Sequence, residues 1–216
     1  MKIQSYDLVI FDCDGVLVDS EPLANQVYVQ MLAEHGFDVN HEEYLKKFSG
    51  AAIFDRLEVT AKQLSWTPPT DFYPIFNLRL AVLTEQELKP VPGIHELIES
   101  LSVPVCIASN GSRKEILLRL QIAQLSEHFT DAIFSGLEVP TPKPAPDVYL
   151  AAAHAFNVPP SRCVVVEDSV PGVTAGVRAG MKVYGYAACT DPALLKAAGA
   201  IPFTTMLELK NILAEV

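Results

Sequence analysis

The sequence has little positive charge. It holds 16 lysine and arginine residues against 26 aspartate and glutamate residues, which gives a formal net charge of -10. Nucleic acids and anionic membranes are bound through basic surfaces, so we expect neither as a partner. A small phosphorylated molecule remains compatible with this charge, because it needs only a local positive site.

The sequence also lacks long apolar runs and paired cysteines. No apolar run approaches the ~18 residues that cross a bilayer. The segment MKIQSYDLVIFD has neither a long apolar stretch nor a small-residue cleavage site, so we expect no signal peptide. The four cysteines, Cys13, Cys106, Cys163 and Cys189, form no CxxC motif. They are typical of small buried thiols in a reducing compartment, and we expect a cytoplasmic protein.

Short apolar runs and helical patterns alternate over much of the chain. Half of the 216 residues are hydrophobic, which is enough for a sizeable core. The apolar runs predict strands at 6–11, 103–108, 132–135, 163–167 and 182–187. The helical patterns lie at 93–101, 112–122, 145–156, 171–179, 191–198 and 206–214. This alternation predicts an α/β fold with a Rossmann-like, doubly wound parallel sheet.

Residues 20–88 interrupt this alternation, because they contain no convincing strand. Leu23, Val27 and Met31 recur at helical spacing. Further helical patterns lie at 41–48, 52–64 and 71–87. We therefore expect a helical cap domain at 20–88, inserted after the first strand, and a catalytic core made of 1–19 and 89–216.

Reactive side chains follow the predicted strands in four clusters. They are Asp12 and Asp14, Ser109 and Asn110, Lys143, and Glu167 with Asp168. Ligands of open parallel sheets bind beyond the carboxyl ends of the strands, so we expect the four clusters to meet there. Each cluster alone is also compatible with a turn, a helix cap or a solvated loop. Their combination is what predicts a site.

Several carboxylates in one place repel one another, and a divalent cation removes that repulsion. Oxygen ligands without clustered histidines favour Mg²⁺. We expect the carboxylates of Asp12 and Asp168 and the backbone carbonyl of Asp14 to bind the ion. Glu167 would bind it directly or through water.

Such a site could bind and cleave a phosphate ester. Asp12, kept ionised by the metal, could attack phosphorus and form an aspartyl-phosphate. Asp14, with its side chain off the metal, could protonate the leaving oxygen and later activate water. Ser109, Asn110 and Lys143 would bind the phosphate through hydrogen bonds and positive charge.

The four clusters resemble the motifs of haloacid dehalogenase-like hydrolases, in the same order. The matching segments are FDCDGVLVDSE, SNGS, KPAPDVY and VVVEDSVPGVTAGVRAGM. The resemblance implies a Rossmann-like core, a helical cap after the first motif, and a metal-dependent aspartyl-phosphate mechanism. It implies Asp12 as nucleophile, Asp14 as acid and base, Ser109 and Lys143 as phosphate ligands, and Asp168 in the metal site.

Within the family, the chain most resembles the group of 6-phosphogluconate phosphatases, phosphoglycolate phosphatases and β-phosphoglucomutases. Haloacid dehalogenases proper need no metal and lack a counterpart of Asp14. The mutases carry a histidine in the first cap helix where this chain has Ala24. Phosphonatases use a cap lysine as a Schiff base, a role that the placement of Lys46 and Lys47 does not favour. We therefore expect a Mg²⁺-dependent phosphatase of a small sugar phosphate or sugar acid phosphate, with a β-phosphoglucomutase-like phosphotransferase as the alternative.

We expect the cap to select the substrate. Lys46, Lys47 and Arg56 lie near Gly50, where a basic group could bind a substrate carboxylate or a second phosphate. The alternative for these residues is a solvated helix face. Tyr149 is expected to lie on the core face of its helix.

A non-catalytic protein is the rival from another class. Response-regulator receivers also combine clustered aspartates, Mg²⁺ and a lysine on a parallel sheet, and a metabolite-binding module is conceivable too. Receivers lack a helical insertion and a carboxylate placed like Asp14, so the sequence favours an enzyme. Without a visible heptad pattern, a monomer is the expected state.

Overall fold

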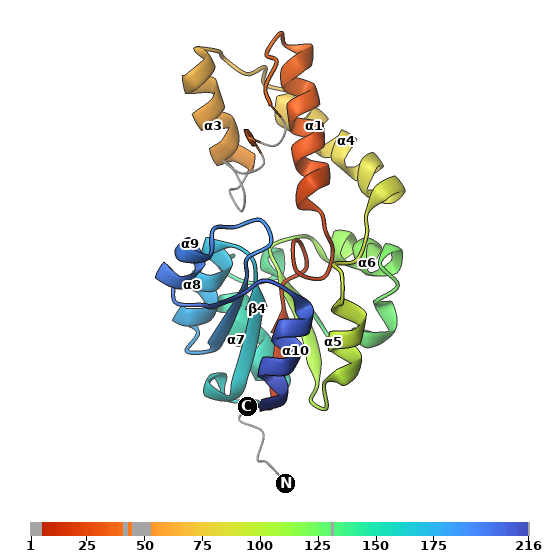
Figure 1. Cartoon of the computed structure of the whole chain (residues 1–216), viewed down its shortest axis with the longest axis vertical. Helices are drawn as coiled ribbons and strands as arrows, with labels where there is room; N and C mark the ends of the chain where they lie inside the picture. The colour runs from red at the N-terminus through yellow and green to blue at the C-terminus, as the bar shows by residue number, and fades with distance from the viewer. Residues whose placement is uncertain (1–5, 41–42, 45–52, 131, 216) are drawn as a thin grey trace.

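The computed structural model of the chain describes residues 6–40, 43–44, 53–130 and 132–215, apart from the side chains of residues 54 and 55 (Figure 1). Its centre is one sheet in the order β3-β2-β1-β4-β5-β6, in which all neighbouring strands are parallel. The strands are β1 (Leu8–Phe11), β2 (Val105–Ser109), β3 (Ile133–Ser135), β4 (Cys163–Glu167), β5 (Lys182–Tyr186) and β6 (Ile201–Phe203). The predicted α/β fold with a doubly wound parallel sheet is confirmed.

Helices cover both faces of the sheet, because its strands bury side chains on both sides. In β1, Val9 and Phe11 face one apolar cluster, whereas Leu8 and Ile10 face another. The first cluster contains side chains of α5 (Ile94–Ser100), α6 (Arg113–Ile122) and α10 (Met206–Glu215). The second contains side chains of α7 (Asp147–Ala155), α8 (Val170–Arg178) and α9 (Pro192–Ala197). Runs that are apolar at every position are the sequence pattern of such strands.

The structure differs from the sequence expectation at one edge of the sheet. Strand β6 was not predicted, because it has only three residues, IPF, which include a proline and do not belong to a longer apolar run. The 3₁₀ helices Ser126–His128, Gly136–Glu138 and Pro160–Arg162 were not predicted either. The other strands and helices of the sheet region begin and end within two residues of their predicted bounds.

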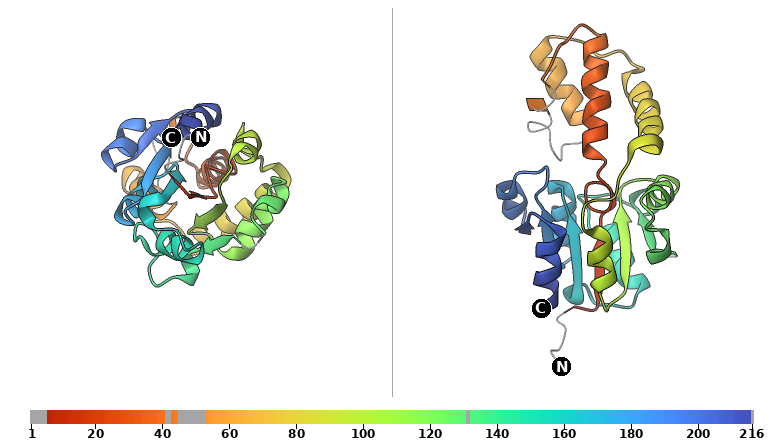
Figure 2. Two further views of the ribbon diagram at one scale, coloured as in Figure 1. Left: turned by 90° about the horizontal axis from the view of Figure 1, so that it is seen from below. Right: turned by 45° about the vertical axis from the view of Figure 1, so that its right-hand side comes forward.

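A separate bundle stands on the carboxyl end of the sheet. It contains α1 (Glu21–Glu34), α3 (Ile53–Leu64) and α4 (Phe72–Glu87), with α1 packed along α4 (Figure 2). Its own apolar cluster surrounds Tyr28, whose ring meets those of Phe72 and Phe76 edge-on at 6.0 and 6.4 Å. The bundle thus has an apolar core of its own, which Leu80 and Leu83 join to the core of the sheet region.

Two chain segments connect the bundle to the sheet, and they pair with each other. The backbone N–H of Asp19 donates to the carbonyl of Lys89 at 2.9 Å, and that of Val91 donates to Leu17 at 3.0 Å. The two segments therefore enter and leave the bundle side by side. In the described part of the chain, no helix has the length and apolar character needed to cross a membrane.

Candidate active site

The first loop of the site depends on a glycine. Asp12 directly follows β1, and Gly15 has a φ of +76°, which favours residues without a side chain. A Cβ at Gly15 would lie only 2.0 Å from Oδ2 of Asp168. Gly15 therefore lets the loop after β1 approach the loop after β4, and it brings Asp12 and Asp168 together.

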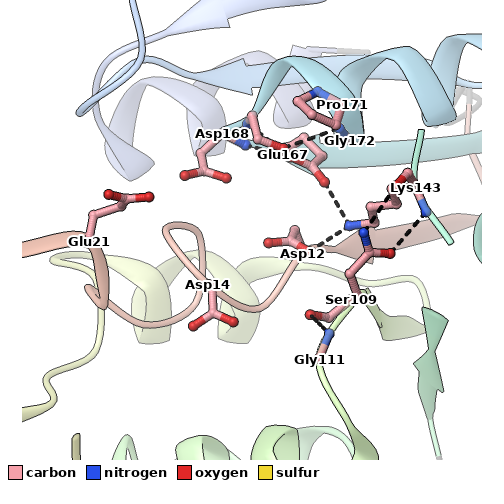
Figure 3. A pocket seen from close by; sticks show the side chains of 12 residues that line it. Asp12, Asp14, Glu21, Ser109, Gly111, Lys143, Glu167, Asp168, Pro171 and Gly172 are labelled. Carbon is pink, nitrogen blue, oxygen red and sulfur yellow. Dashed lines mark hydrogen bonds and ion pairs between the residues drawn. The ribbon is translucent and has the colours of Figure 1, made fainter. Parts of the chain in front are cut away.

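Lys143 joins the two acidic loops from a third direction. Its Nζ donates to Oδ1 of Asp12 at 2.5 Å and to Oε1 of Glu167 at 2.7 Å (Figure 3). All three side chains are buried. Buried charges persist only when they are paired, so this network fixes the lysine over Asp12.

Glu167 is held by hydrogen bonds on both of its oxygens. Besides Lys143, the hydroxyl of Tyr149 donates to Oε1 at 2.9 Å. Oε2 accepts from the backbone N–H groups of Asp168 and Ser169 and from the Ser169 hydroxyl, each at 3.0 Å. A Cβ at Gly172 would lie 1.7 Å from Oε1, so α8 can pass over this carboxylate only with glycine at that position.

The second motif of the sequence positions the lysine loop. The backbone N–H of Lys143 donates to Oδ1 of Asn110 at 2.9 Å, and the Asn110 amide donates to the Lys143 carbonyl at 3.2 Å. Both polar atoms of the Asn110 side chain are thus hydrogen-bonded to the backbone of Lys143. Asn110, which was predicted to bind phosphate, lines the same cavity as Ser109 and Lys143. Ser109 ends β2, is buried, and accepts from the N–H of Gly111 at 3.2 Å.

Burial and repulsion shape the protonation of the acidic groups. Burial, assisted by Glu167 and partly offset by Lys143, raises the pKa of Asp12 to about 7. Burial together with Glu167 and Asp12 holds the pKa of Asp168 well above its ordinary value. Burial alone would also raise the pKa of Glu167, but Lys143 and the surrounding donors outweigh it, so this pKa is lowered. Two carboxylates are therefore short of positive charge.

The donor set of the cluster fits a hard cation. Carboxylate oxygens of Asp12, Glu167 and Asp168 all lie within 4.8 Å of one another. Such oxygen donors suit a divalent ion like Mg²⁺, whose charge would offset the burial and the repulsion that raise the pKa values of Asp12 and Asp168. The cluster can hold a metal ion.

Two cavities meet at this point. The acidic cavity, of about 250 Å³, is lined among others by Asp12, Ser109, Asn110, Lys143, Glu167 and Asp168. The arginine cavity, also of about 250 Å³, lies between the bundle and the sheet and is lined among others by Ala24, Ile53, Arg56, Asn77, Thr84 and Arg119. Asp14 and Glu21 line both. Figure 3 shows the Asp14 side chain pointing away from the other acids of the cluster.

The structure brings together the site residues predicted on the sheet loops. Of the residues predicted in the bundle, Arg56 is the one that the structure describes, and it does not join this group. Arg56 lines the arginine cavity, but its guanidinium donates to Glu21 at 2.7 Å. Lys46 and Lys47 lie outside the described residues.

Sequence reasoning missed three residues of the site. Glu21 points toward Asp168 and contributes to its raised pKa (Figure 3). Tyr149 lies in the core as expected, yet its hydroxyl also binds Glu167. Arg119 lies with Nε 3.1 Å from Oδ1 of Asp14. Only Glu21 had a sequence signal, since it is the last residue of the first matching segment, FDCDGVLVDSE.

Comparison with known proteins identifies the family. Residues 6–180 match the model of the haloacid dehalogenase-like hydrolases. The chain belongs to this family. A 6-phosphogluconate phosphatase of Escherichia coli is 33% identical to this chain over 187 residues, which cover 86% of this chain and 84% of the relative.

Solved structures of haloacid dehalogenase-like proteins agree with this assignment. One from Agrobacterium tumefaciens superposes with a TM-score of 0.91 at 33% identity, and covers 97% of this chain and 98% of that one. A family hydrolase from Deinococcus radiodurans, solved with bound phosphate and sodium, gives a TM-score of 0.85 at 34% identity and covers 99% of this chain and 97% of that one. The predicted family and the prediction of an enzyme are thereby confirmed.

Proposed function

We propose that this hydrolase is a Mg²⁺-dependent phosphatase of small phosphorylated metabolites, namely sugar phosphates or sugar acid phosphates. The observation that carries the proposal is Asp12 at the floor of the acidic cavity, with Lys143 at 2.5 Å and two further carboxylates within 4.8 Å. A nucleophile, a fixed cation and a metal-binding cluster are what transfer of a phosphoryl group to a carboxylate requires. The phosphatase named among the relatives supports the same reaction class.

The carboxylates of Asp12 and Asp168 and the backbone carbonyl of Asp14 would hold the Mg²⁺. When bound, the ion supplies positive charge to the phosphate oxygens and keeps Asp12 ionised. Glu167 already accepts five hydrogen bonds, so we assign it contact through water rather than direct binding. Its main role is to hold Lys143.

The reaction proceeds in two steps on the chain's own residues. In the first, Asp12 attacks phosphorus and the bond to the leaving oxygen breaks, while Asp14 gives that oxygen a proton. In the second, Asp14 takes a proton from water, which attacks the aspartyl-phosphate and releases inorganic phosphate. Lys143 and Ser109 bind the phosphate oxygens throughout, aided by backbone N–H groups of the loop after β2.

The helical bundle acts as the cap in this proposal. Residues 20–88 would close over the acidic cavity, exclude water and contact the leaving group. Ala24 lines the arginine cavity, and its methyl group cannot transfer a proton as the histidine of a mutase does. A contact of Lys46 or Lys47 with substrate, a monomeric state and a cytoplasmic location stay predictions of the sequence.

The test is phosphate release from sugar phosphates, 6-phosphogluconate, phosphoglycolate and β-glucose 1-phosphate, each with Mg²⁺ and with a chelator. Release that requires Mg²⁺ is the expected result. Conversion of β-glucose 1-phosphate to the 6-phosphate without release would show a mutase instead. If no compound reacts and no phosphate can be trapped on Asp12, the non-catalytic alternative replaces the proposal.

A further inference from the structure

Arg119 differs from the other arginines that pair with carboxylates in the described part of the chain. Arg56, Arg79, Arg113 and Arg162 donate hydrogen bonds to Glu21, Glu34, Glu138 and Asp7, respectively. The side chain of Arg119 is only 16% exposed, yet its Nε and Nη1 are buried without a hydrogen-bond partner among the described residues. Its ion pair with Asp14 is close but not aligned for a hydrogen bond.

Buried donors without acceptors are costly, so such groups in a native protein call for a partner. Arg119 lines the arginine cavity, which adjoins the acidic cavity at Asp14. The third guanidinium nitrogen, Nη2, is not one of these buried nitrogens without a partner. Because Arg119 lines this cavity, a molecule bound there can contact its guanidinium and supply an acceptor.

The position of Arg119 suits the leaving group of a phosphate ester. Its Nη1 would lie 3.3 Å from a Cβ at Gly111, so the guanidinium packs over the loop that begins with Ser109. On its other side is Asp14, the proposed proton donor to the leaving oxygen. A group attached close to that oxygen enters the arginine cavity beside Arg119.

The charge in the cavity favours an anionic group there. The other cavity arginine, Arg56, is 3% exposed and hydrogen-bonded to Glu21, so its charge is already paired. Arg119 has only the Asp14 carboxylate within 4 Å among the described acids, and that side chain is 38% exposed. A carboxylate offers two charged acceptors with the spacing of two guanidinium N–H groups, whereas a hydroxyl offers one neutral acceptor.

We propose that Arg119 is a specificity-determining residue, which binds a carboxylate on the leaving group and makes the enzyme prefer phosphorylated acids to phosphorylated alcohols. This rests on the proposed phosphatase function and narrows its substrate class. The residue lies on α6 of the sheet region rather than in the bundle, where the basic reader of the substrate was expected.

Two matched substrate pairs test the proposal. One is 6-phosphogluconate against sorbitol 6-phosphate, and the other is phosphoglycolate against 2-hydroxyethyl phosphate. In each pair only the carboxylate is replaced, by a hydroxymethyl group. The readout is the ratio of kcat/KM for acid over alcohol within one protein, because any effect of a variant on folding or on Asp14 cancels in that ratio.

The variants are Arg119→Met, Arg119→Lys and, as a matched control on the same helix, Arg113→Met. Arg113 is surface-exposed and pairs with Glu138, outside both cavities. The wild type should favour the acid by about tenfold or more in at least one pair, the size of one charge-assisted hydrogen bond. Arg119→Met should bring the acid-to-alcohol ratio near one, mainly through a higher KM for the acid. Arg119→Lys should keep part of the preference for the acid, and Arg113→Met should keep all of it.

Two results would overturn the proposal. A wild-type ratio near one in both pairs would do so even if Arg119→Met failed to fold. A ratio unchanged in a folded Arg119→Met, with kcat lowered equally for every substrate, would show that Arg119 only positions Asp14. If the wild type hydrolyses nothing, the proposed function fails, and the ratio of dissociation constants measured by calorimetry for the same pairs then judges Arg119.

Discussion

Lys143, which is buried, and Arg119, which is 16% exposed, each lie beside an aspartate of the same loop, yet their surroundings differ. Lys143 donates to two carboxylates, and one of these is itself held by Tyr149 and three donors of its own loop. Arg119 has buried N–H groups without acceptors. Lys143 and Glu167 of the acidic cavity are thus paired with each other and with their neighbours before substrate arrives, whereas the arginine cavity contains N–H groups that still lack acceptors among the described residues.

The difference matches what each cavity has to recognise. Every phosphomonoester presents the same dianion, so a rigid set of donors can be prepared for it in advance. Leaving groups vary in shape and charge, and they meet the interface between the sheet and the bundle. Variants in the acidic cavity should therefore affect all substrates alike, and variants in the arginine cavity should affect substrates unequally.

The largest effect is expected for Asp12→Asn. The amide cannot attack phosphorus, so kcat should fall by about 10⁴-fold or more, and by the same factor for every substrate. Phosphate release by the purified variant measures this, with thermal unfolding as a check on folding. Near-normal turnover on any one substrate would show that another group is the nucleophile and that the two cavities do not divide the work as proposed.

Asp14→Asn comes next and probes the border between the cavities. The amide keeps the shape and the backbone carbonyl but cannot act as a general acid or base, so kcat should fall by about 10²–10⁴-fold. Stabilisation of the protein by Mg²⁺ should persist, because the proposed ligand is the main chain. The assignment fails if this variant keeps its full rate but is no longer stabilised by the ion.

Removal of the metal gives the third effect, and it depends on pH. The pKa of Asp12 is raised by burial to about 7, and that of Asp168 is raised as well. The folded state without metal thus holds these protons more tightly than the unfolded state. The free energy of unfolding that comes from protonated Asp12 is therefore present at low pH and is lost as the pH rises from about 4 to about 7.

Magnesium binds the deprotonated carboxylates, so it should stabilise the protein more at pH 8 than at pH 5.5. At one hundred times Kd the gain is about 2.7 kcal/mol. Thermal unfolding with Mg²⁺ or with EDTA at both pH values measures it, and Asp168→Asn serves as the variant that should lose the gain. Equal stabilisation at both pH values would mean that Asp12 and Asp168 are not the ligands.

The acidic cavity could largely be predicted from the sequence, because most of its acidic groups and its phosphate-binding candidates lie at the end of a strand or in the loop that follows one. Asp12, Ser109 and Glu167 lie at or next to the carboxyl ends of β1, β2 and β4, and parallel strands bring these ends to one edge. Apolar runs reveal such strands, and β4 has its predicted bounds. What the pattern does not contain is the orientation of each side chain, such as the contact between Lys143 and Glu167, 24 residues apart.

The arginine cavity could not be predicted in the same way. Arg119 lies within α6, where an arginine in an amphipathic pattern is indistinguishable from a solvated one. Its burial arises because α6 lies beside the loop after β1 and below the bundle, which is a tertiary arrangement (Figure 1). Sequence reasoning looked for basic groups in the inserted segment, and the one of these that the structure describes, Arg56, lines the arginine cavity and is paired with Glu21.

The smallest effect, expected for Tyr149→Phe, tests whether the acidic cavity acts as one rigid unit. The change removes one hydrogen bond to Glu167 and leaves the ring in the core. A hydrogen bond to a charged group contributes about 1.5–3 kcal/mol. Because Glu167 also holds Lys143, loss of this hydrogen bond should position Lys143 less well and lower kcat/KM by up to about tenfold. Tyr184→Phe, a buried tyrosine on β5 outside both cavities, is the matched control and should leave kcat/KM unchanged. Because Tyr149 touches no substrate, the decrease in kcat/KM should be the same for acids and alcohols, in contrast to Arg119→Met. A change in the acid-to-alcohol ratio of kcat/KM would mean that the two cavities are coupled through Asp12 and Asp14.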